Sequence, residues 1–195
     1  MARKPGVTVD DTRDALLRAA ATIFSRDGFE GASIADIAAE ADTSSGPIYT
    51  HFGSKAELFV ATLRANTDRS LGHVLGGVDR GDAASVLAAF GRALSSHPTR
   101  SGLLLEAIVA SRRDPAVAEL VARAFSEREE GVQKLVRHGQ GTGVVDARVS
   151  PDAIARFSMV VGLGTMLVEA IGLDPIDDAD WSRLIDGITA TMRSR

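Results

Sequence analysis

The chain has 195 residues, a formal net charge of −4, 45% hydrophobic residues and 25% charged residues. These are the proportions of a globular protein, and they exclude disorder over most of the chain. The sequence contains no cysteine, which excludes a disulfide framework, a thiolate zinc site and a cysteine nucleophile. The charged start and the absence of a long uncharged run lead us to expect no targeting peptide, no membrane span and a cytoplasmic location.

Apolar residues recur at helical spacing along almost the whole chain, and strict alternation is nearly absent. We therefore expect an all-α protein of about nine helices. Capping residues predict helix starts at Thr8–Asp11, Ser33, Ser54, Asp82, Asp114-Pro115, Ser150-Pro151 and Asp177 or Asp178. Glycines predict helix ends at Gly28, Gly139 and Gly172.

Three short helices fit within residues 8–52, and five of the nine aromatic residues fall among the first sixty. Large rings fill the core of a small helical unit efficiently. We predict an N-terminal domain of residues 1–53 and a larger helical domain of residues 54–195. No linker separates them, so the helix that begins near residue 54 is expected to belong to both.

Residues 33–51 predict two short helices joined by a tight turn. The first helix would run from Ser33 to about Ala41, and the second from Ser44 or Ser45 to His51. Between them lies Asp42, one of the few non-glycine residues that tolerate a left-handed conformation. This arrangement indicates a helix-turn-helix motif.

The second of these helices is apolar only at Ile48 and Phe52, and its other face carries short hydrogen-bonding groups. Such groups suit base edges and phosphate oxygens. Lys55 follows on the first turn of the next helix, where a cation and free backbone N–H groups can hold a phosphate. The candidate DNA-binding residues are Ser33, Ser44, Ser45, Gly46, Tyr49, Thr50, His51 and Lys55.

The net charge of residues 1–53 is unfavourable for DNA binding, because this segment contains five basic and eight acidic side chains. A DNA-binding domain is expected to present a basic face. We therefore expect the charges to segregate, with Arg3, Lys4 and Lys55 near the DNA and the acids elsewhere. Arg3-Lys4 is either a flexible arm that reaches an adjacent groove or simply a disordered start.

The segments Ala32–Ala41 and Ser44–Lys55, preceded by Ile23-Phe24 and Gly28-Phe29, resemble the tetracycline-repressor (TetR) family. The resemblance covers residues 12–60 closely, and beyond them only the helical plan and the length agree. It implies a homodimeric transcriptional regulator, usually a repressor of a palindromic operator. The family's third helix enters the major groove, its last two long helices pair with the partner subunit, and a small effector binds in the larger domain.

The resemblance also implies roles for single residues. Tyr49, His51 and Lys55 would contact phosphates, Ser33 would cap its helix near the DNA backbone, and Ser44, Ser45 and Thr50 would reach bases. The sequence departs from the family at two places. Asp42-Thr43 replaces the usual Gly-Val of the turn, and Ser45 stands where a basic residue is common.

Residues 82–170 supply more large apolar side chains than a plain bundle needs, with few polar groups beside them. This composition favours a pocket for an apolar or amphipathic small molecule. The candidate ligand-binding residues are Phe90, His97, Ile108, Phe125, Phe157 and Met166. The helices expected over 151–171 and 178–192 carry apolar stripes too wide for one core. They predict a dimer interface with candidate residues Gly162, Trp181, Ile185 and Ile188.

No catalytic triad, metal-ligand cluster or paired carboxylates stand out in the sequence. We expect no enzymatic activity, no cofactor and no metal, and we expect Gly139–Gly143 to form a turn and not a phosphate loop. The partners expected are double-stranded operator DNA, a small effector and a second copy of the chain. A small helical enzyme and a helical interaction module that does not bind DNA remain the alternatives.

Overall fold

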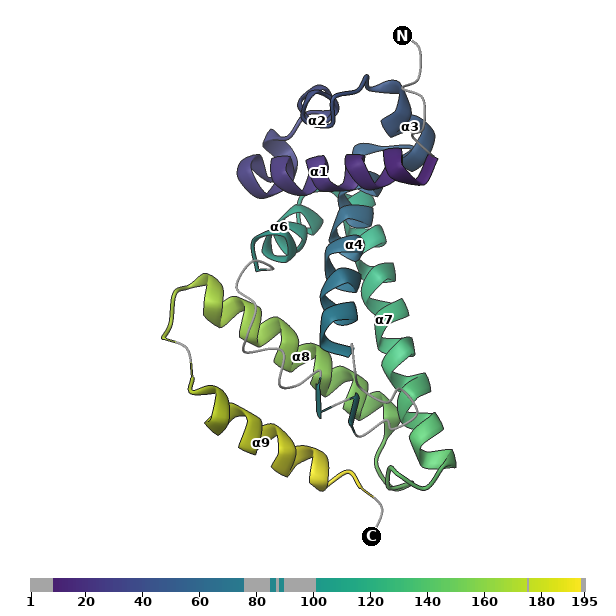
Figure 1. The fold of residues 1–195 in the computed structure, drawn as a ribbon, viewed down its shortest axis with the longest axis vertical. Helices are drawn as coiled ribbons and strands as arrows, with labels where there is room; N and C mark the ends of the chain where they lie inside the picture. The colour runs from purple at the N-terminus through teal and green to yellow at the C-terminus, as the bar shows by residue number, and fades with distance from the viewer. Residues whose placement is uncertain (1–8, 76–84, 87, 90–100, 175, 194–195) are drawn as a thin grey trace. The chain divides into compact units, whose positions relative to one another are not determined.

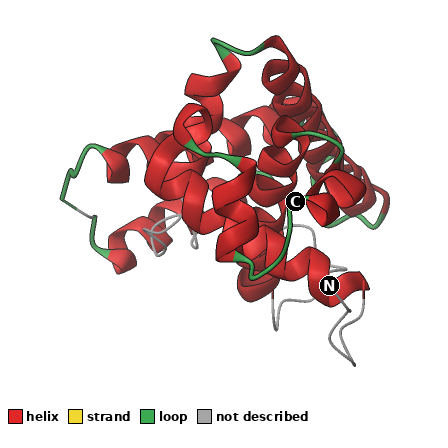
Figure 2. Cartoon of the chain, turned by 90° about the horizontal axis from the view of Figure 1, so that it is seen from above, coloured by secondary structure: helices red, strands yellow, loops and turns green. Residues whose placement is uncertain are grey.

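The computed structural model describes residues 9–75, 85–86, 88–89, 101–174 and 176–193. Within these residues the eight named elements are all α-helices, as Figures 1 and 2 show. They are α1 (Val9–Gly31), α2 (Ile34–Glu40), α3 (Gly46–Phe52), α4 (Lys55–Leu75), α6 (Ser101–Ser111), α7 (Pro115–Gly141), α8 (Pro151–Ala170) and α9 (Asp178–Ala190). The predicted all-α class is confirmed.

The number of helices in the described part is close to the nine that the sequence predicts. Of the helix expected after Asp82, four residues are described, Ser85, Val86, Ala88 and Ala89, and all four are helical. Two predicted ends differ slightly from the structure. α1 continues to Gly31 across a kink at Gly28, and α7 continues two residues beyond Gly139.

The chain forms two compact units. The N-terminal unit comprises residues 1–67 and 102–124, and the C-terminal unit comprises residues 68–101 and 125–195. The N-terminal unit therefore contains α1, α2, α3, most of α4, nearly all of α6 and the start of α7. The predicted functional boundary near residue 54 stays a prediction.

Aromatic side chains form the centre of the N-terminal unit. The ring of Phe59 on α4 lies 4.8 Å from that of Phe24 and 5.1 Å from that of Phe29, centroid to centroid. Phe24 and Phe59 are almost fully buried, as are Ile37 of α2 and Ile48 of α3. Each of the first four helices thus buries at least one large side chain, which holds the short α2 and α3 in place.

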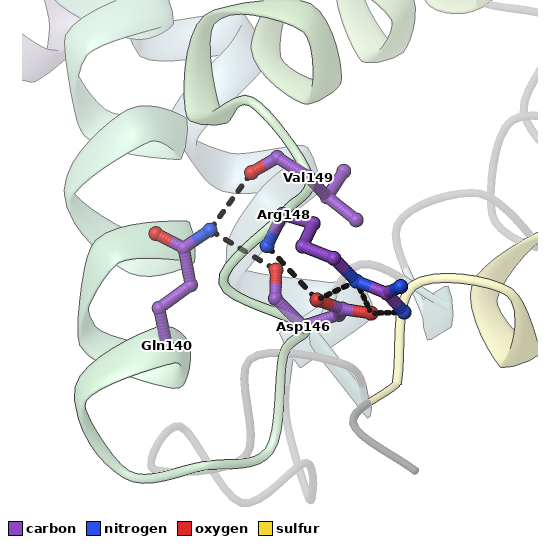
Figure 3. A network of polar contacts seen from close by, with 4 residues as sticks. All are labelled: Gln140, Asp146, Arg148 and Val149. Carbon is purple, nitrogen blue, oxygen red and sulfur yellow. Dashed lines mark hydrogen bonds and ion pairs between the residues drawn. The ribbon is translucent and has the colours of Figure 1, made fainter.

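The connection between α7 and α8 is fixed to the end of α9 in the C-terminal unit. The Gln140 side chain donates to the carbonyls of Asp146 and Val149 at 3.2 and 2.8 Å, and Arg148 binds the Asp146 carboxylate (Figure 3). The Asp146 N–H donates to the carbonyl of Met192 at 2.8 Å. These bonds enclose a small apolar cluster of Val136, Val145 and Ile154, against which Met192 also packs.

α8 has a largely apolar, largely exposed surface. The window Pro151–Val168 is long and apolar enough to cross a membrane on length and composition alone, and only 11% of it is buried. The sequence predicts no membrane-spanning helix, because the charge-free stretch of residues 157–168 is shorter than the ~20 residues of a span. Exposed large apolar residues gather in this region: Phe157, Val160, Leu167, Val168, Ile171, Leu173, Ile176 and Leu184.

Candidate nucleic-acid interface

The turn between α2 and α3 is closed by backbone hydrogen bonds. The N–H groups of Asp42 and Thr43 donate to the carbonyls of Ala39 and Ala38 at 3.1 and 3.0 Å. Asp42 has φ of 51°, which is the left-handed conformation expected of it. Ending a helix this way usually requires glycine, and Asp42 takes the place that Gly occupies in most of the family.

The start of α2 is capped as the sequence predicts. The Ser33 Oγ accepts a hydrogen bond from the Asp36 N–H at 3.0 Å, and its own hydroxyl donates to the Asp36 carboxylate at 2.6 Å. Both the donor and an acceptor of this hydroxyl are therefore used within the chain. Ser33 is suited to hold the start of α2 and less to bind DNA directly.

α3 has a buried side and a polar exposed side. Ile48 and Phe52 are buried and α3 packs against α1, whereas Tyr49 is 55% exposed. Ser44, Gly46 and Thr50 are also exposed, and Ser45 and His51 are half-buried. The predicted contact residues of this segment thus lie together at the surface around one short helix.

The hydroxyl of Thr50 already has a donor role. It donates to the carbonyl of Gly46 at 3.1 Å. What Thr50 can still offer is a methyl group and the lone pairs of its oxygen.

Lys55 occupies a different position from the one a free phosphate-binding lysine would have. Its Nζ donates to the carbonyls of Phe29 and Ala32 at 2.8 and 3.0 Å, and lies 4.6 Å from the centroid of the Phe29 ring. Two of its three N–H groups are therefore bound to the segment between α1 and α2. The ammonium fixes the start of α4 to that segment.

Two contacts of this unit escaped sequence reasoning. The exposed Arg13 of α1 places its guanidinium 5.5 Å from the centroid of the Phe52 ring, beside α3. Glu106 of α6 accepts a hydrogen bond from the Phe29 N–H at 2.7 Å. Residues 39 and 77 positions apart make these contacts, and no local pattern announces contacts of that range.

The charges of the N-terminal unit segregate in part. Arg26, near the end of α1, holds Asp27 through two hydrogen bonds of 2.8 and 2.7 Å, and these lower the pKa of Asp27. The same bonds raise the pKa of Arg26, as do the nearby charges of Asp36 and Glu40. Acidic groups therefore gather around the end of α1 and α2, whereas Arg13 lies next to α3.

The model of the bacterial regulatory proteins of the tetR family matches residues 16–62, the segment that contains this helix-turn-helix. Residues 16–62 thus match the DNA-binding segment of the TetR family. Over 64 residues it is 44% identical to the HTH-type transcriptional repressor NicS of Pseudomonas putida, a match that covers 31% of this chain and only 30% of NicS. The chain thus matches less than a third of the length of NicS.

Longer matches extend the likeness beyond that part. The chain is 29% identical over 135 residues to the HTH-type nicotine-responsive transcriptional repressor HdnoR of Paenarthrobacter nicotinovorans, covering 67% of this chain and 70% of HdnoR. A TetR-family structure from Rhodococcus sp. superposes with a TM-score of 0.79 at 22% identity, covering 95% of this chain and all of the other. At that identity the structural match establishes the family's fold.

The candidate ligand residues are distributed over both units. Ile108 lies on α6 in the N-terminal unit, and Phe125, Phe157 and Met166 lie on α7 and α8 in the C-terminal unit. Phe125 and Met166 are half-buried, whereas Phe157 is 45% exposed. Phe90 and His97 lie outside the described residues. Among the described residues, no group of three or more acidic or histidine side chains could hold a metal ion.

The candidate interface residues stay a prediction, and the structure gives their burial in a single chain. Gly162 is buried within the subunit, and Ile185 is only 5% exposed. Trp181 and Ile188 are half-buried on the same side of α9 as Ile185. The apolar positions that are exposed are others, such as Gly164 on α8 and Leu184 on α9.

Proposed function

We propose that the protein is a cytoplasmic, homodimeric repressor that binds a palindromic DNA operator and leaves it when a small apolar or amphipathic effector binds. The observation that carries DNA binding is the two-sided α3. Ile48 and Phe52 anchor it, and Ser44, Tyr49 and Thr50 are exposed. A short helix supported from behind, with polar groups in front, fits the major groove.

In this proposal, bases are read from the first part of the α3 region and by Thr50. Ser44 and Ser45 hydrogen-bond to base edges, and Gly46 lets the backbone approach the DNA closely. Thr50 contributes its methyl group to a thymine methyl or accepts a bond from a base amino group, since its own proton is used within the helix.

Phosphate contacts position the helix in the groove. We assign them to the exposed Tyr49, to His51, and to Arg13, which lies beside α3 on the neighbouring helix. Lys55 has one N–H left for a phosphate, so its contribution to DNA binding combines one contact with the placement of α4. Ser33 acts through the helix that it caps.

The exposed apolar stripe of α8 supports the homodimer. Phe157, Val160, Gly164 and Leu167 follow one another at intervals of three or four residues and are all exposed. In an isolated subunit such a stripe would face water over several turns. A second copy of the chain in two-fold contact covers both stripes at once. A dimer in solution therefore accounts for the exposed apolar side of α8 without a membrane.

The effector half of the proposal rests on composition and on a relative. HdnoR is named as nicotine-responsive, and the described part of the C-terminal region is rich in half-buried apolar groups such as Phe125 and Met166. We propose that these residues, together with Phe90 and His97 of the same unit, bind an apolar or amphipathic molecule. Phe157 contributes to the effector site only where the dimer leaves it uncovered.

The test of DNA binding is an electrophoretic mobility shift with the DNA upstream of the protein's own coding sequence, followed by footprinting. We expect a protected two-fold symmetric site, and release by some members of a panel of apolar amines and aromatic compounds. A variant with Thr50→Ala should bind the same fragment with altered base preference. If no upstream or genomic fragment is bound, the alternatives of a small helical enzyme or an interaction module without DNA gain ground.

A further inference from the structure

The backbone of Phe29 is held by charged groups of two other helices. Its N–H donates to the Glu106 carboxylate of α6 at 2.7 Å. Its carbonyl accepts from the Lys55 ammonium of α4 at 2.8 Å. Two successive peptide groups at the end of α1, on either side of the Phe29 α-carbon, are thus bonded to α6 and to α4.

Gly28 makes the contact with Glu106 possible. It has φ of 71° and interrupts α1, so that the Phe29 N–H leaves the helical pattern and becomes available. A β-carbon at Gly28 would lie 3.0 Å from Oε1 of Glu106. The absence of a side chain therefore admits the carboxylate to the backbone, and the positive φ presents the N–H to it.

The other attachments of α6 are of a different kind. Its buried side chains are apolar, and they are Leu103, Leu104, Ala107 and Ala110. Apolar packing is non-directional and tolerates small shifts of one helix along another. A charged hydrogen bond is directional and weakens steeply when its geometry is lost. The Glu106 contact thus fixes the register and the angle of α6 in a way that the apolar contacts do not.

We propose that Glu106 is a positioning residue that sets the orientation of the helix-turn-helix relative to α6 through the Phe29 N–H. This inference rests on the proposed DNA-binding function. It names the contact that aligns the helix-turn-helix of each subunit with that of its partner in a dimer. Loss of the contact removes one backbone hydrogen bond and leaves the ring packing of Phe24, Phe29 and Phe59 in place, so the helix-turn-helix stays folded but can rotate on α6. The affinity for an operator with two half-sites then falls, whereas the affinity for a single half-site does not change.

The experiment compares Glu106→Ala with Glu106→Gln, which keeps an acceptor oxygen, and with Glu119→Ala, an exposed glutamate on α7 of the same unit. Affinity is measured for the footprinted operator and for a duplex that carries one of its half-sites. We expect Glu106→Ala to weaken operator binding by about tenfold, as for loss of one charged hydrogen bond, and to leave half-site binding unchanged. Glu106→Gln should recover most of the loss, and Glu119→Ala should equal the wild type.

An equal loss of affinity for both duplexes would mean that Glu106 only stabilises the fold of the helix-turn-helix. That result would overturn the proposal. Unchanged binding to both duplexes would overturn it as well. The thermal unfolding midpoint of each variant separates a folded, misaligned protein from a destabilised one.

A measurement without DNA separates failure of this inference from failure of the proposed function. The chain has no cysteine, so spin labels can be placed uniquely at Glu40→Cys on α2 and Arg112→Cys after α6, diluted into unlabelled protein. We expect a narrow distance distribution in the wild-type and Glu106→Gln backgrounds and a broad one with Glu106→Ala. If the wild type binds no DNA, the proposed function is wrong. If the distance distribution is unchanged in Glu106→Ala, the positioning role is wrong, whether or not the wild type binds DNA.

Discussion

In the aromatic core formed by α1 and α4 of the N-terminal unit the large side chains are enclosed, whereas on α8 and α9 of the C-terminal unit many large apolar side chains are exposed. Phe59 of α4 has no exposed surface, and Phe157 of α8 is 45% exposed. The helix-turn-helix is therefore held by contacts within its own chain. The outer side of α8 is not covered by the described residues of its own chain, and the proposed dimer would cover it. The two regions show that a helix-turn-helix motif can be recognised from residue types over a short segment of sequence. An interface can be recognised only when the burial of its side chains in the folded chain is known.

The largest effect should come from the same substitution made in each region. We expect Phe59→Ala to lower the free energy of unfolding by about 3–5 kcal/mol, because it opens a cavity between Phe24 and Phe29. DNA binding should be lost with it. Phe157→Ala should change the unfolding of the subunit much less and should weaken self-association instead. Denaturant unfolding and sedimentation of both variants check this. Equal loss of folding stability in both would break the comparison.

A charge on the exposed stripe of α8 should separate the subunits. We expect Leu167→Glu to raise the dimer dissociation constant by at least about tenfold, since a two-fold interface would bury the new carboxylate twice. Sedimentation velocity at micromolar concentration measures this, with Lys134→Glu on the exposed side of α7 as the control. A wild-type protein that is monomeric under these conditions would contradict the dimer. Ile185→Asp is a poor test, because Ile185 is buried within its own unit.

Lys55→Ala should act first on the fold of the N-terminal unit. The substitution leaves the carbonyls of Phe29 and Ala32 without their donor, at a cost of about 1–3 kcal/mol. Chemical denaturation followed by fluorescence of the chain's Tyr49 and Trp181, with amide exchange to localise the change, measures the effect. Wild-type stability combined with weaker DNA binding would instead make Lys55 a simple phosphate contact.

Much of the helix-turn-helix is predictable from the sequence, because its signals are local. The left-handed Asp42, the Ser33 cap and the buried Ile48 and Phe52 all follow from residue type and spacing over a few positions. The double bonding of Lys55 could not be predicted, since a lysine at the start of a helix is equally suited to a phosphate. Its acceptors, 26 and 23 residues earlier, become its neighbours only in the folded chain.

The interface side of α9 shows the opposite limit. The sequence correctly marks Trp181, Ile185 and Ile188 as an apolar stripe, but a stripe does not state whether it packs inward or against a partner. Ile185 and Thr189 are buried within the subunit and Leu184 is exposed, and the interface role of the stripe stays a prediction. The same ambiguity affects Phe157, which composition alone assigned to an effector pocket.

Arg13→Gln should affect DNA binding without affecting the fold. The guanidinium is exposed, and its contact with Phe52 is with one face of a ring that packing already fixes. If Arg13 neutralises one phosphate, the slope of log K against log salt should become shallower by about one unit, equally for specific and unrelated sequences. Fluorescence anisotropy across a salt series measures this. The nearby Arg18→Gln on the same helix is a matched control, and an equal change in both would point to a general charge effect.

The smallest expected effect again distinguishes the two units, through their ion pairs. Glu129 of α7 accepts two hydrogen bonds from Arg156 of α8, at 2.8 and 3.0 Å, and they lower the pKa of Glu129. A carboxylate with a depressed pKa in the folded state stabilises the fold above its ordinary pKa, and that contribution is lost as the pH falls through the depressed value. Asp27 in the N-terminal unit is shifted in the same direction by Arg26. However, these two residues are adjacent in sequence and remain close together after unfolding.

Below about pH 4 we therefore expect Glu129→Gln to flatten the acid-induced loss of stability slightly, and Asp27→Asn to flatten it less. Thermal unfolding from pH 7 to pH 3 measures both. A larger change for Asp27→Asn would show that the local pair contributes more than the one that joins two helices.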